Sequence, residues 1–508
     1  MIKVIKKYLL YFVLITSIFF LIINNLELNF QSLSIILSLY CLILVSFINY
    51  IYNFKTFSYL PIFPLINIYF LICYLGFFFL DKYSLIDINN SLIKINDLDY
   101  SIKILFSGYI SITLGYHLFL ISTKKFQRRG FDFFNLEDKE ILIIGILLTS
   151  LNIIFFYILK IQFLISSLSQ LKYPILLTGI GLLTLFVVLN QKKGINFKNI
   201  FCIILISIPL ILEILTGTLA FPFMVIFMIF VFVSYLNKKF FIVPILIIAL
   251  AFSFFHLGKY ELRNLSSNKI FVGSEYNKIQ IFINVYKNVF KDSIEKFQKK
   301  ISCNKQIQDN SIDNKDCNFD RDLRLEKRVL HSFFSLLHVT KLTKEDADSE
   351  KKLLGRYKYV PYWNGYSYKI LYSKLIPRVF WENKPSDDLG NEFGHRYFIL
   401  TKENTKDKLI HDTNTSWNMP ILNEFYVNFG NEGVLYGMFL MGLLFGLIVK
   451  MGTIQNKKNL EVIIFFFLFT PLFFMESHFS LLFGAIIQSY LFLMLSCYIL
   501  LIILRKYY

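Results

Sequence analysis

Long apolar stretches recur along this chain, and they constrain its fold more than any other feature. A helix needs about 17–25 such residues to cross a bilayer. We count about twelve stretches of this length, centred near Thr16, Leu42, Phe70, Thr113, Leu148, Leu182, Pro209, Ile226, Ile247, Met441, Leu468 and Met494. The stretches are continuous and do not alternate with polar residues, so they predict helices and not the strands of a barrel.

Composition supports the same conclusion. Hydrophobic residues make up 55% of the 508 residues, and the mean hydropathy is +0.54. A chain this apolar does not fit a soluble protein of several domains. We therefore predict an all-α polytopic membrane protein with about twelve transmembrane helices.

The positions of Lys and Arg in the short loops predict the orientation. Positive charge gathers at one set of helix ends, at Lys3, Lys6, Lys7, Lys55, Lys124, Lys125, Arg128, Arg129, Lys192, Lys193, Lys238, Lys239, Lys457, Lys458, Arg505 and Lys506. The segments 24–31, 216–220 and 477–480 at the opposite ends have none. Both termini are predicted to be cytoplasmic. Much of the net charge of +18 is thus a topology signal and no evidence for nucleic-acid binding.

The chain divides into three parts. Residues 1–256 hold nine predicted transmembrane helices, residues 257–432 form one large periplasmic loop between helices 9 and 10, and residues 433–508 hold the last three helices. Within the loop, residues 266–320 are polar and rich in Lys and Asn, which is typical of a variable insertion. An apolar stripe predicts a helix over residues 322–342, which either lies on the membrane surface or packs against the rest of the loop.

The insertion contains the only two cysteines of the loop, Cys303 and Cys317. An oxidising periplasm would favour a disulfide between them, which would close a flexible segment. The stretch has too few further ligands for a zinc site. We predict a structural disulfide with no part in chemistry, and neither a metal nor a cofactor.

One group of candidate site residues lies in the run from Leu375 to Tyr397. Its cations, Arg378, Lys384 and Arg396, suit phosphate oxygens, because guanidinium offers a planar fork and ammonium a point charge. Trp381 lies among them and suits the apolar face of a sugar, and His395 is a candidate proton acceptor. Together these residues favour an anionic, sugar-bearing ligand over solvated charges on a loop.

A second group lies between His411 and Gly433 and leads into the tenth predicted helix. Asn414 and its hydroxyl-bearing neighbours suit a ligand rich in hydroxyl groups, and Trp417 follows them. Glu424 stands at an apolar boundary, where loss of water would bring a carboxyl group towards the range of a general base. A structural pairing of Glu424 with a nearby arginine remains open.

Further charged residues are predicted near the outer ends of helices. Arg263, after the ninth helix, is placed to meet a lipid diphosphate, or else anchors the helix at the headgroups. Intramembrane Glu213, Glu476 and His478 lie on the same side and are costly in lipid, which makes them functional candidates. Asp97 and Asp99 form a DxD in a predicted external loop, a pattern that some metal-dependent glycosyltransferases use.

At these residues the chain resembles the Wzy-type O-antigen polymerases, the oligosaccharide repeat unit polymerases. The resemblance rests on the run I-P-R-x-F-W-x-x-K-P from Ile376 to Pro385 and on a second run, T-S…E-x-Y-x-N-F-G-x-x-G, at Thr415, Ser416, Glu424, Tyr426, Asn428, Phe429, Gly430 and Gly433. The layout of helices around one large outer loop is similar as well. The insertion at residues 266–320 departs from the pattern.

The resemblance implies a GT-C-like fold in the bacterial inner membrane that joins undecaprenyl-diphosphate-linked glycans in the periplasm. Arg263, Arg378, Arg396 and Lys384 would hold the diphosphate, and Glu424 or else His395 would be the base. Trp381, Trp417, Asn414 and Tyr426 would contact the glycan. The lipid bilayer and a chain-length regulator would be further partners.

Four other functions stay open on the sequence. A structural or regulatory partner of glycan assembly would leave the carboxylates predicted at the outer side of the membrane unexplained. An O-antigen ligase shares the topology and the leaving group. A polysaccharide flippase or transporter would need charges lining both halves of the membrane, whereas the charges here gather at the outer side. A transferase that uses a lipid monophosphate sugar has the DxD at Asp97 as its only support.

Overall fold

The structure is a computed structural model of the chain. It describes residues 30–53, 62–75, 95–123, 136–159, 172–191, 196–215, 220–237, 279–291, 324–343, 361–374, 389–397, 401–403, 409–411, 417–451 and 477–507, and single residues at 247, 251, 255, 258, 262, 295, 376, 381, 464, 466, 467 and 475.

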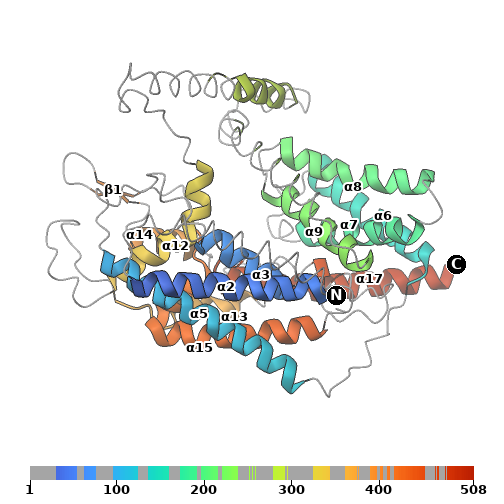
Figure 1. Cartoon of the computed structure of the whole chain (residues 1–508). Coiled ribbons are helices and arrows are strands. Elements are labelled where there is room, and N and C mark those ends of the chain that lie inside the picture. Colours follow the sequence, from blue (N-terminus) through green and yellow to red (C-terminus); the bar gives the residue numbers. More distant parts are fainter. Residues whose placement is uncertain are drawn as a thin grey trace, which may run out of the picture.

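The described residues are almost entirely helical (Figure 1). The N-terminal helices are α2 (Phe30–Asn53), α3 (Ile62–Phe70), η1 (Leu71–Leu75), α5 (Ile95–Ser122), α6 (Asp138–Asn152), η4 (Ile153–Ile158), α7 (Lys172–Asn190), α8 (Phe197–Leu215) and α9 (Ala220–Asn237). Later elements are α12 (Arg324–Leu342), η10 (Tyr366–Ile370), α13 (Leu371–Lys374), α14 (Leu389–Arg396), α15 (Ile421–Met451) and α17 (Phe479–Tyr507). The strands β1 (Thr401–Glu403) and β2 (Leu409–His411) form an antiparallel pair.

Six helices among the described residues are long and apolar enough to cross a membrane, as a helical membrane protein requires. They span Leu98–Ser122, Asp138–Ile158, Lys172–Asn190, Phe197–Leu215, Ile421–Met451 and Ser489–Lys506. Shorter apolar helices cover Ser34–Ser46, Ile62–Leu75 and Phe221–Asn237. Nine of the predicted membrane helices therefore coincide with helices of the structure. The stretches centred near Thr16, Ile247 and Leu468 lie wholly or mostly outside the described residues.

The tightest contact between long helices joins α5 and α15, which lie side by side in Figure 1. Glycines make it possible. A Cβ atom at Gly442 of α15 would overlap the carbonyl oxygen of Ile112 in α5, and one at Gly115 would overlap that of Phe439. Small residues at such positions allow two backbones to approach closely, which is how helices gain packing energy in lipid.

The contacts also give the relative directions of the helices. Along α5, Gly108, Gly115 and Phe119 meet Val434, Phe439 and Gly446 of α15 in that order, so the two helices run in the same direction. Helices α6 and α7 run in opposite directions, because Gly145 meets Leu183 whereas Asn152 donates to the Lys172 carbonyl. Both results agree with the order of predicted spans, in which the fourth and tenth are parallel and the fifth and sixth antiparallel.

Two basic side chains form contacts at helix ends that the charge pattern assigns to the cytoplasm. Lys450, at the end of α15, donates a hydrogen bond to the carbonyl of Thr123, just after α5. Arg505, near the end of α17, pairs with Glu140 in the first turn of α6 at 2.8 Å. Which side of the membrane these ends face remains a prediction.

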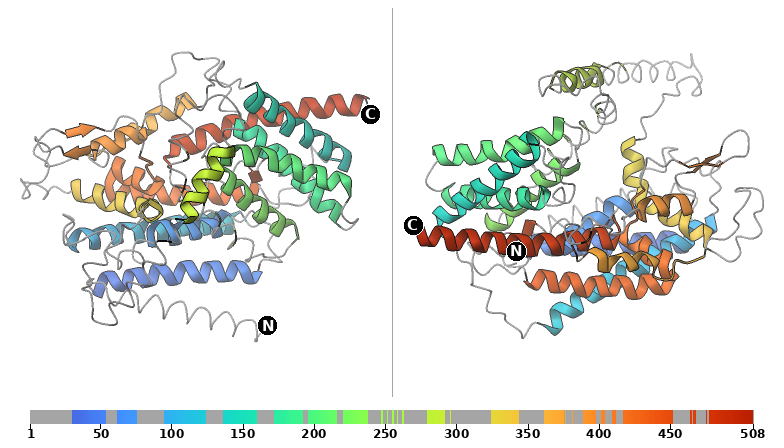
Figure 2. Two further views of the ribbon diagram at one scale, coloured as in Figure 1. Left: turned by 90° about the horizontal axis from the view of Figure 1, so that it is seen from above. Right: turned by 180° about the vertical axis from the view of Figure 1, so that it is seen from behind.

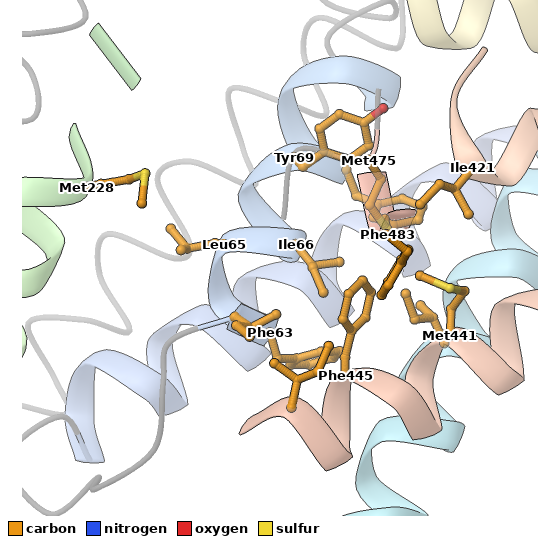
Figure 3. Packing of buried hydrophobic residues seen from close by; sticks show 14 of the residues in the cluster. Phe63, Leu65, Ile66, Tyr69, Met228, Ile421, Met441, Phe445, Met475 and Phe483 are labelled. Carbon is orange, nitrogen blue, oxygen red and sulfur yellow. The ribbon is translucent and has the colours of Figure 1, made fainter. Parts of the chain in front are cut away.

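The hydrophobic core continues from this helix pair towards α3 and α17. Phe445 of α15 lies against Phe63 and Ile66 of α3, and Ile421 lies beside Met475 (Figure 3). The backbone N–H of Ile421 donates to the Met475 carbonyl at 3.1 Å. Packing of this kind fixes the first turn of α15, where a predicted catalytic residue lies.

Helices α2, α3, α5, α12 and α15 contact one another and form a first group. Helices α6, α7, α8 and α9 form a second group beside it (Figure 2). Helix α17 connects the two groups, because it contacts η10 and α13 as well as α6 and α7. The start of α17 therefore belongs to the first group, where the candidate site lies, and its end packs on the second.

The helix over residues 322–342 packs on helices outside the predicted loop, a position that neither prediction named. This helix, α12, packs against η1, α5 and α15. The hydroxyl groups of Ser101 in α5 and Thr340 in α12 share a hydrogen bond of 2.7 Å, and that of Tyr69 pairs with Ser332 at 3.1 Å. The apolar stripe thus belongs to the core of the chain.

One local expectation was wrong: Asp97 and Asp99 lie within helix α5 and not in a loop. Helix α15 begins at Ile421, within the predicted periplasmic loop, and is interrupted at Gly430, where φ is +64°. Helices η10, α13 and α14 also lie within that predicted loop.

We predict that Gly442→Leu destabilises the chain by about 3 kcal/mol, because the added side chain forces α5 and α15 apart. Thermal unfolding of the full chain in detergent measures the effect. Leu440→Phe is the matched control, since it adds volume on an exposed position of the same helix. Equal stability of both variants would show that the close approach is not required.

Candidate functional site

The candidate site forms where residues 361–370 lie on the first turns of α15. The N–H of Trp363 donates to the Val427 carbonyl at 2.9 Å, and the N–H of Asn364 donates to the Asn428 carbonyl at 3.1 Å. In a regular helix these carbonyls would serve the residues four positions later. The interruption at Gly430 opens them to another segment.

Gly430 is required here for two reasons. Its φ of +64° lies in the left-handed region that glycine adopts without strain. A side chain at this position would also collide with the hydroxyl group of Tyr362. The glycine noted in the second motif run therefore marks the place where residues 361–370 meet α15.

The side chain of Glu424 in α15 connects this helix with residues 361–370 and with the start of α17. Its side chain is 0% exposed. One carboxylate oxygen accepts a hydrogen bond from the Ser367 hydroxyl at 2.6 Å, and the other accepts one from the backbone N–H of Phe479 at 2.6 Å. Because Phe479 begins α17, the carboxylate lies at the positive end of that helix, which stabilises its charge.

Asn428 completes this buried network. It lies one turn after Glu424, and its side-chain amide donates to the Ser367 hydroxyl at 2.9 Å and to the Glu424 carbonyl at 2.8 Å. Ser367 thus accepts from α15 and donates to α15 at the same time. We call Glu424, Ser367, Asn428 and the Phe479 N–H the Glu424 network.

Tyr368 borders the Glu424 network. Burial raises the pKa of its hydroxyl well above the usual value, and the nearby Glu424 carboxylate adds to the shift. The nearby Ser367 hydroxyl acts in the opposite direction and lowers the pKa of Tyr368. The Ser367 and Tyr368 side chains do not, however, form a hydrogen bond of good geometry. Tyr368 is therefore a neutral phenol beside a buried negative charge.

A second cluster, partly exposed, also contacts residues 361–370. Arg396 of α14 donates to the Pro361 carbonyl at 2.9 Å, and its guanidinium lies 5.5 Å from the centre of the Trp363 ring. Glu392 raises the pKa of the Tyr366 hydroxyl, burial adds to the shift, and Arg396 opposes it. We call Arg396, Trp363, Tyr366 and Glu392 the Arg396 cluster.

The two predicted groups of residues thus meet through a segment that neither contained. Residues 361–370 contact Arg396 through Pro361 and Trp363, and they contact Glu424 through Ser367. The sequence offered a signal for Asn428, which follows Glu424 at helical spacing. It offered none for Ser367, because its contact depends on how a loop packs.

Two of the predicted glycan-binding residues form hydrogen bonds with other segments of the chain. The Tyr426 ring is buried, and its hydroxyl pairs with that of Thr343 at 3.0 Å. The indole N–H of Trp417 donates to the Ser335 hydroxyl at 2.8 Å, and its backbone N–H donates to the Gly390 carbonyl at 3.3 Å. Trp417 therefore connects α12 with α14.

The other predicted residues are placed as follows. His395 is partly buried beside Arg396 in α14, Trp381 is partly buried, and His478 is buried next to Phe479. Glu213 lies in the second group of helices, paired with Lys172 at 2.5 Å and with the Tyr157 hydroxyl at 2.6 Å. Outside the described residues lie Arg263, Arg378, Lys384, Asn414, Glu476, Cys303 and Cys317.

Glu424 in this arrangement holds α15, residues 361–370 and the start of α17 together. Both carboxylate oxygens already accept hydrogen bonds, and such bonds favour the charged form. A general base must instead reach the proton that it takes. Of the two predicted bases, the partly exposed His395 fits that requirement better. No group of three or more His, Cys, Asp or Glu among the described residues could hold a metal ion.

We predict that Glu424→Ala destabilises the chain by about 3 kcal/mol, because two buried donors lose their acceptor. Ser367→Ala should lower the free energy of unfolding by less. The double variant Glu424→Ala, Ser367→Ala should lower it by less than the sum of the two single variants. Thermal unfolding in detergent measures all three. Glu432→Ala, an exposed acid on the same helix, is the control. A loss no larger than that of the control would contradict the role of the network.

Acid should also weaken the packing behind the site. Burial lowers the pKa of His338 in α12 to about 4. The unfolded chain therefore binds this proton at a higher pH than the folded chain, and stability should fall as the pH drops from about 6.5 towards 4. The unfolding temperature of the chain, compared with that of His338→Phe, measures the effect. A variant that keeps the full acid sensitivity would contradict the prediction.

No protein-family model, no curated protein and no solved structure matches the chain. What the site does is therefore inferred from its own contacts together with the motif resemblance.

Proposed function

We propose that this chain is a membrane glycosyltransferase that polymerises undecaprenyl-diphosphate-linked oligosaccharide repeat units into a surface polysaccharide. In this proposal it has about twelve transmembrane helices in a GT-C-like arrangement in the bacterial inner membrane. Both termini are cytoplasmic, and the large loop with the Arg396 cluster faces the periplasm.

One observation carries the proposal. Residues 361–370 contact both Arg396, from the first predicted group of site residues, and Glu424, from the second motif run, although these two residues lie more than twenty positions apart in the sequence. Arg396 is partly exposed, and the Glu424 carboxylate that holds the segment is buried. A binding surface with a rigid support is what group transfer requires.

The reaction follows from the leaving group. An acceptor hydroxyl oxygen of the incoming repeat unit attacks the anomeric carbon of the growing glycan. The bond from that carbon to the diphosphate breaks, undecaprenyl diphosphate leaves, and the hydroxyl proton passes to a base. The donor is already activated, so the protein must stabilise the negative charge that develops on the diphosphate and accept one proton.

The residues take distinct roles in this scheme. Arg396 binds the diphosphate with those N–H groups that do not serve Pro361, and Trp363 holds its guanidinium from one side. His395, the next residue, accepts the proton. Arg263, Arg378 and Lys384 are proposed as further diphosphate ligands, and Trp381 and Asn414 as glycan contacts, on the sequence resemblance alone.

We predict that Arg396→Ala lowers the polymerisation rate by about 100-fold, because a cation aimed at the developing charge is lost. Arg396→Lys should recover only part of the activity, since an ammonium cannot form two parallel hydrogen bonds to phosphate. Glycan banding in a strain deleted for this gene, complemented with each variant, measures the effect. Arg505→Lys at the far end of α17 is the matched control.

The deletion strain also separates the alternatives. A single repeat unit on the lipid core, with the ladder restored by the wild type, supports a polymerase. Accumulation of lipid-linked polymer with no glycan on the core would identify a ligase. An unchanged ladder would reject both, and a flippase would then become the leading candidate. A normal ladder with Arg396→Ala would reject the role of Arg396.

A further inference from the structure

A short helix over residues 279–291 lies within the segment that the sequence predicts to be a polar insertion. It stands apart from the other described helices in Figure 1, where it is drawn in olive near the top. In the view from above (Figure 2, left) it crosses the direction in which α2 and α5 run.

One side of this helix is packed. Val285 and Tyr286 are buried with Leu262 in a small core of their own, and Phe255 joins that core. The Tyr286 hydroxyl donates to the Phe255 carbonyl at 2.6 Å. Phe255 lies at the end of the ninth predicted transmembrane stretch and Leu262 follows it, so the helix is attached where that stretch is predicted to leave the membrane.

A second side is apolar and exposed. Ile279, Ile283 and Phe290 are 45%, 56% and 58% exposed. At about 100° per residue, these three side chains fall within about 40° of one another. They form one stripe, which we call the Phe290 stripe, next to the packed side.

Cationic and amide side chains follow the stripe around the helix. Lys287 and Lys291 border it, and both are exposed. Lys291 lies 3.9 Å from Glu295, an exposed pair that contributes little. Asn284 and Asn288 lie beyond the lysines. An apolar stripe flanked by cations is the pattern of a helix that lies in a bilayer interface, where lysines reach the headgroups from an apolar stem.

We propose that helix 279–291 docks on the bilayer through the Phe290 stripe, with Lys287 and Lys291 contacting anionic phospholipid headgroups. The occupant is a lipid surface, because the helix is attached at the end of a membrane-spanning stretch and presents cations at the edge of its apolar side. The proposal does not depend on the glycosyltransferase function. It assigns the insertion a second attachment to the membrane besides the transmembrane helices.

Quenching by brominated lipid tests this placement. The full chain is reconstituted at one copy per nanodisc in phosphatidylglycerol and phosphatidylcholine, with part of the lipid brominated in its acyl chains. Ile283→Trp reports on the stripe, and Phe290→Trp repeats the measurement at a second exposed position. Asn288→Trp, on the opposite side of the helix, is the matched control. The parent chain supplies the signal of its three native tryptophans.

We expect brominated lipid to lower the added emission of Ile283→Trp and Phe290→Trp by about half, and that of Asn288→Trp by less than about a tenth, because only the stripe meets acyl chains. Equal quenching at all three positions, or none at position 283, would overturn the proposal. Emission at 283 that changes only when two copies share a nanodisc would overturn it in favour of contact between copies.

The headgroup part has its own test. Quenching of Ile283→Trp should be stronger in discs with phosphatidylglycerol than in discs of phosphatidylcholine alone. Replacing Lys287 and Lys291 with Gln should remove that difference, because the attraction of cations to an anionic surface is lost. Equal quenching in both lipids would overturn the role of the lysines.

Discussion

Helices α5 and α15 are far apart in the sequence, and their close approach supports most of the first group of helices. The contact depends on glycines, because a side chain at Gly442 or Gly115 would overlap a backbone carbonyl of the other helix. In lipid there is little hydrophobic gain in bringing two apolar helices together, so close packing must hold them. Since α15 is fixed in this way, so are its first turns, which carry Glu424 and the interruption at Gly430.

The first turns of α15 show how a charge is kept in an apolar interior. A buried carboxylate is costly unless it is hydrogen-bonded. Glu424 has the Ser367 hydroxyl, the Phe479 N–H and the positive end of α17. The same contacts that make its charge tolerable join three segments of the chain. The Arg396 cluster, by contrast, is partly exposed.

Sequence reasoning located helices but did not reveal which distant segments meet. Apolar periodicity predicted α12, because that pattern is a local property. It did not reveal that Tyr426 and Trp417, proposed as glycan contacts, form hydrogen bonds to side chains on α12 or just after it. Aromatic residues near a predicted site look alike in a sequence, whether they face a ligand or the core.

The sequence by itself determined that the chain is helical and apolar enough for a membrane, because helix length and charge distribution are read along the chain. It also named Arg396 and Glu424 as the residues around which a site could form. Only the tertiary structure decided that residues 361–370 connect them, that Glu424 is buried and hydrogen-bonded, and that a helix in the polar insertion exposes an apolar stripe. Each of these depends on which distant segments pack together, and packing is decided by shape complementarity between side chains that no local pattern records.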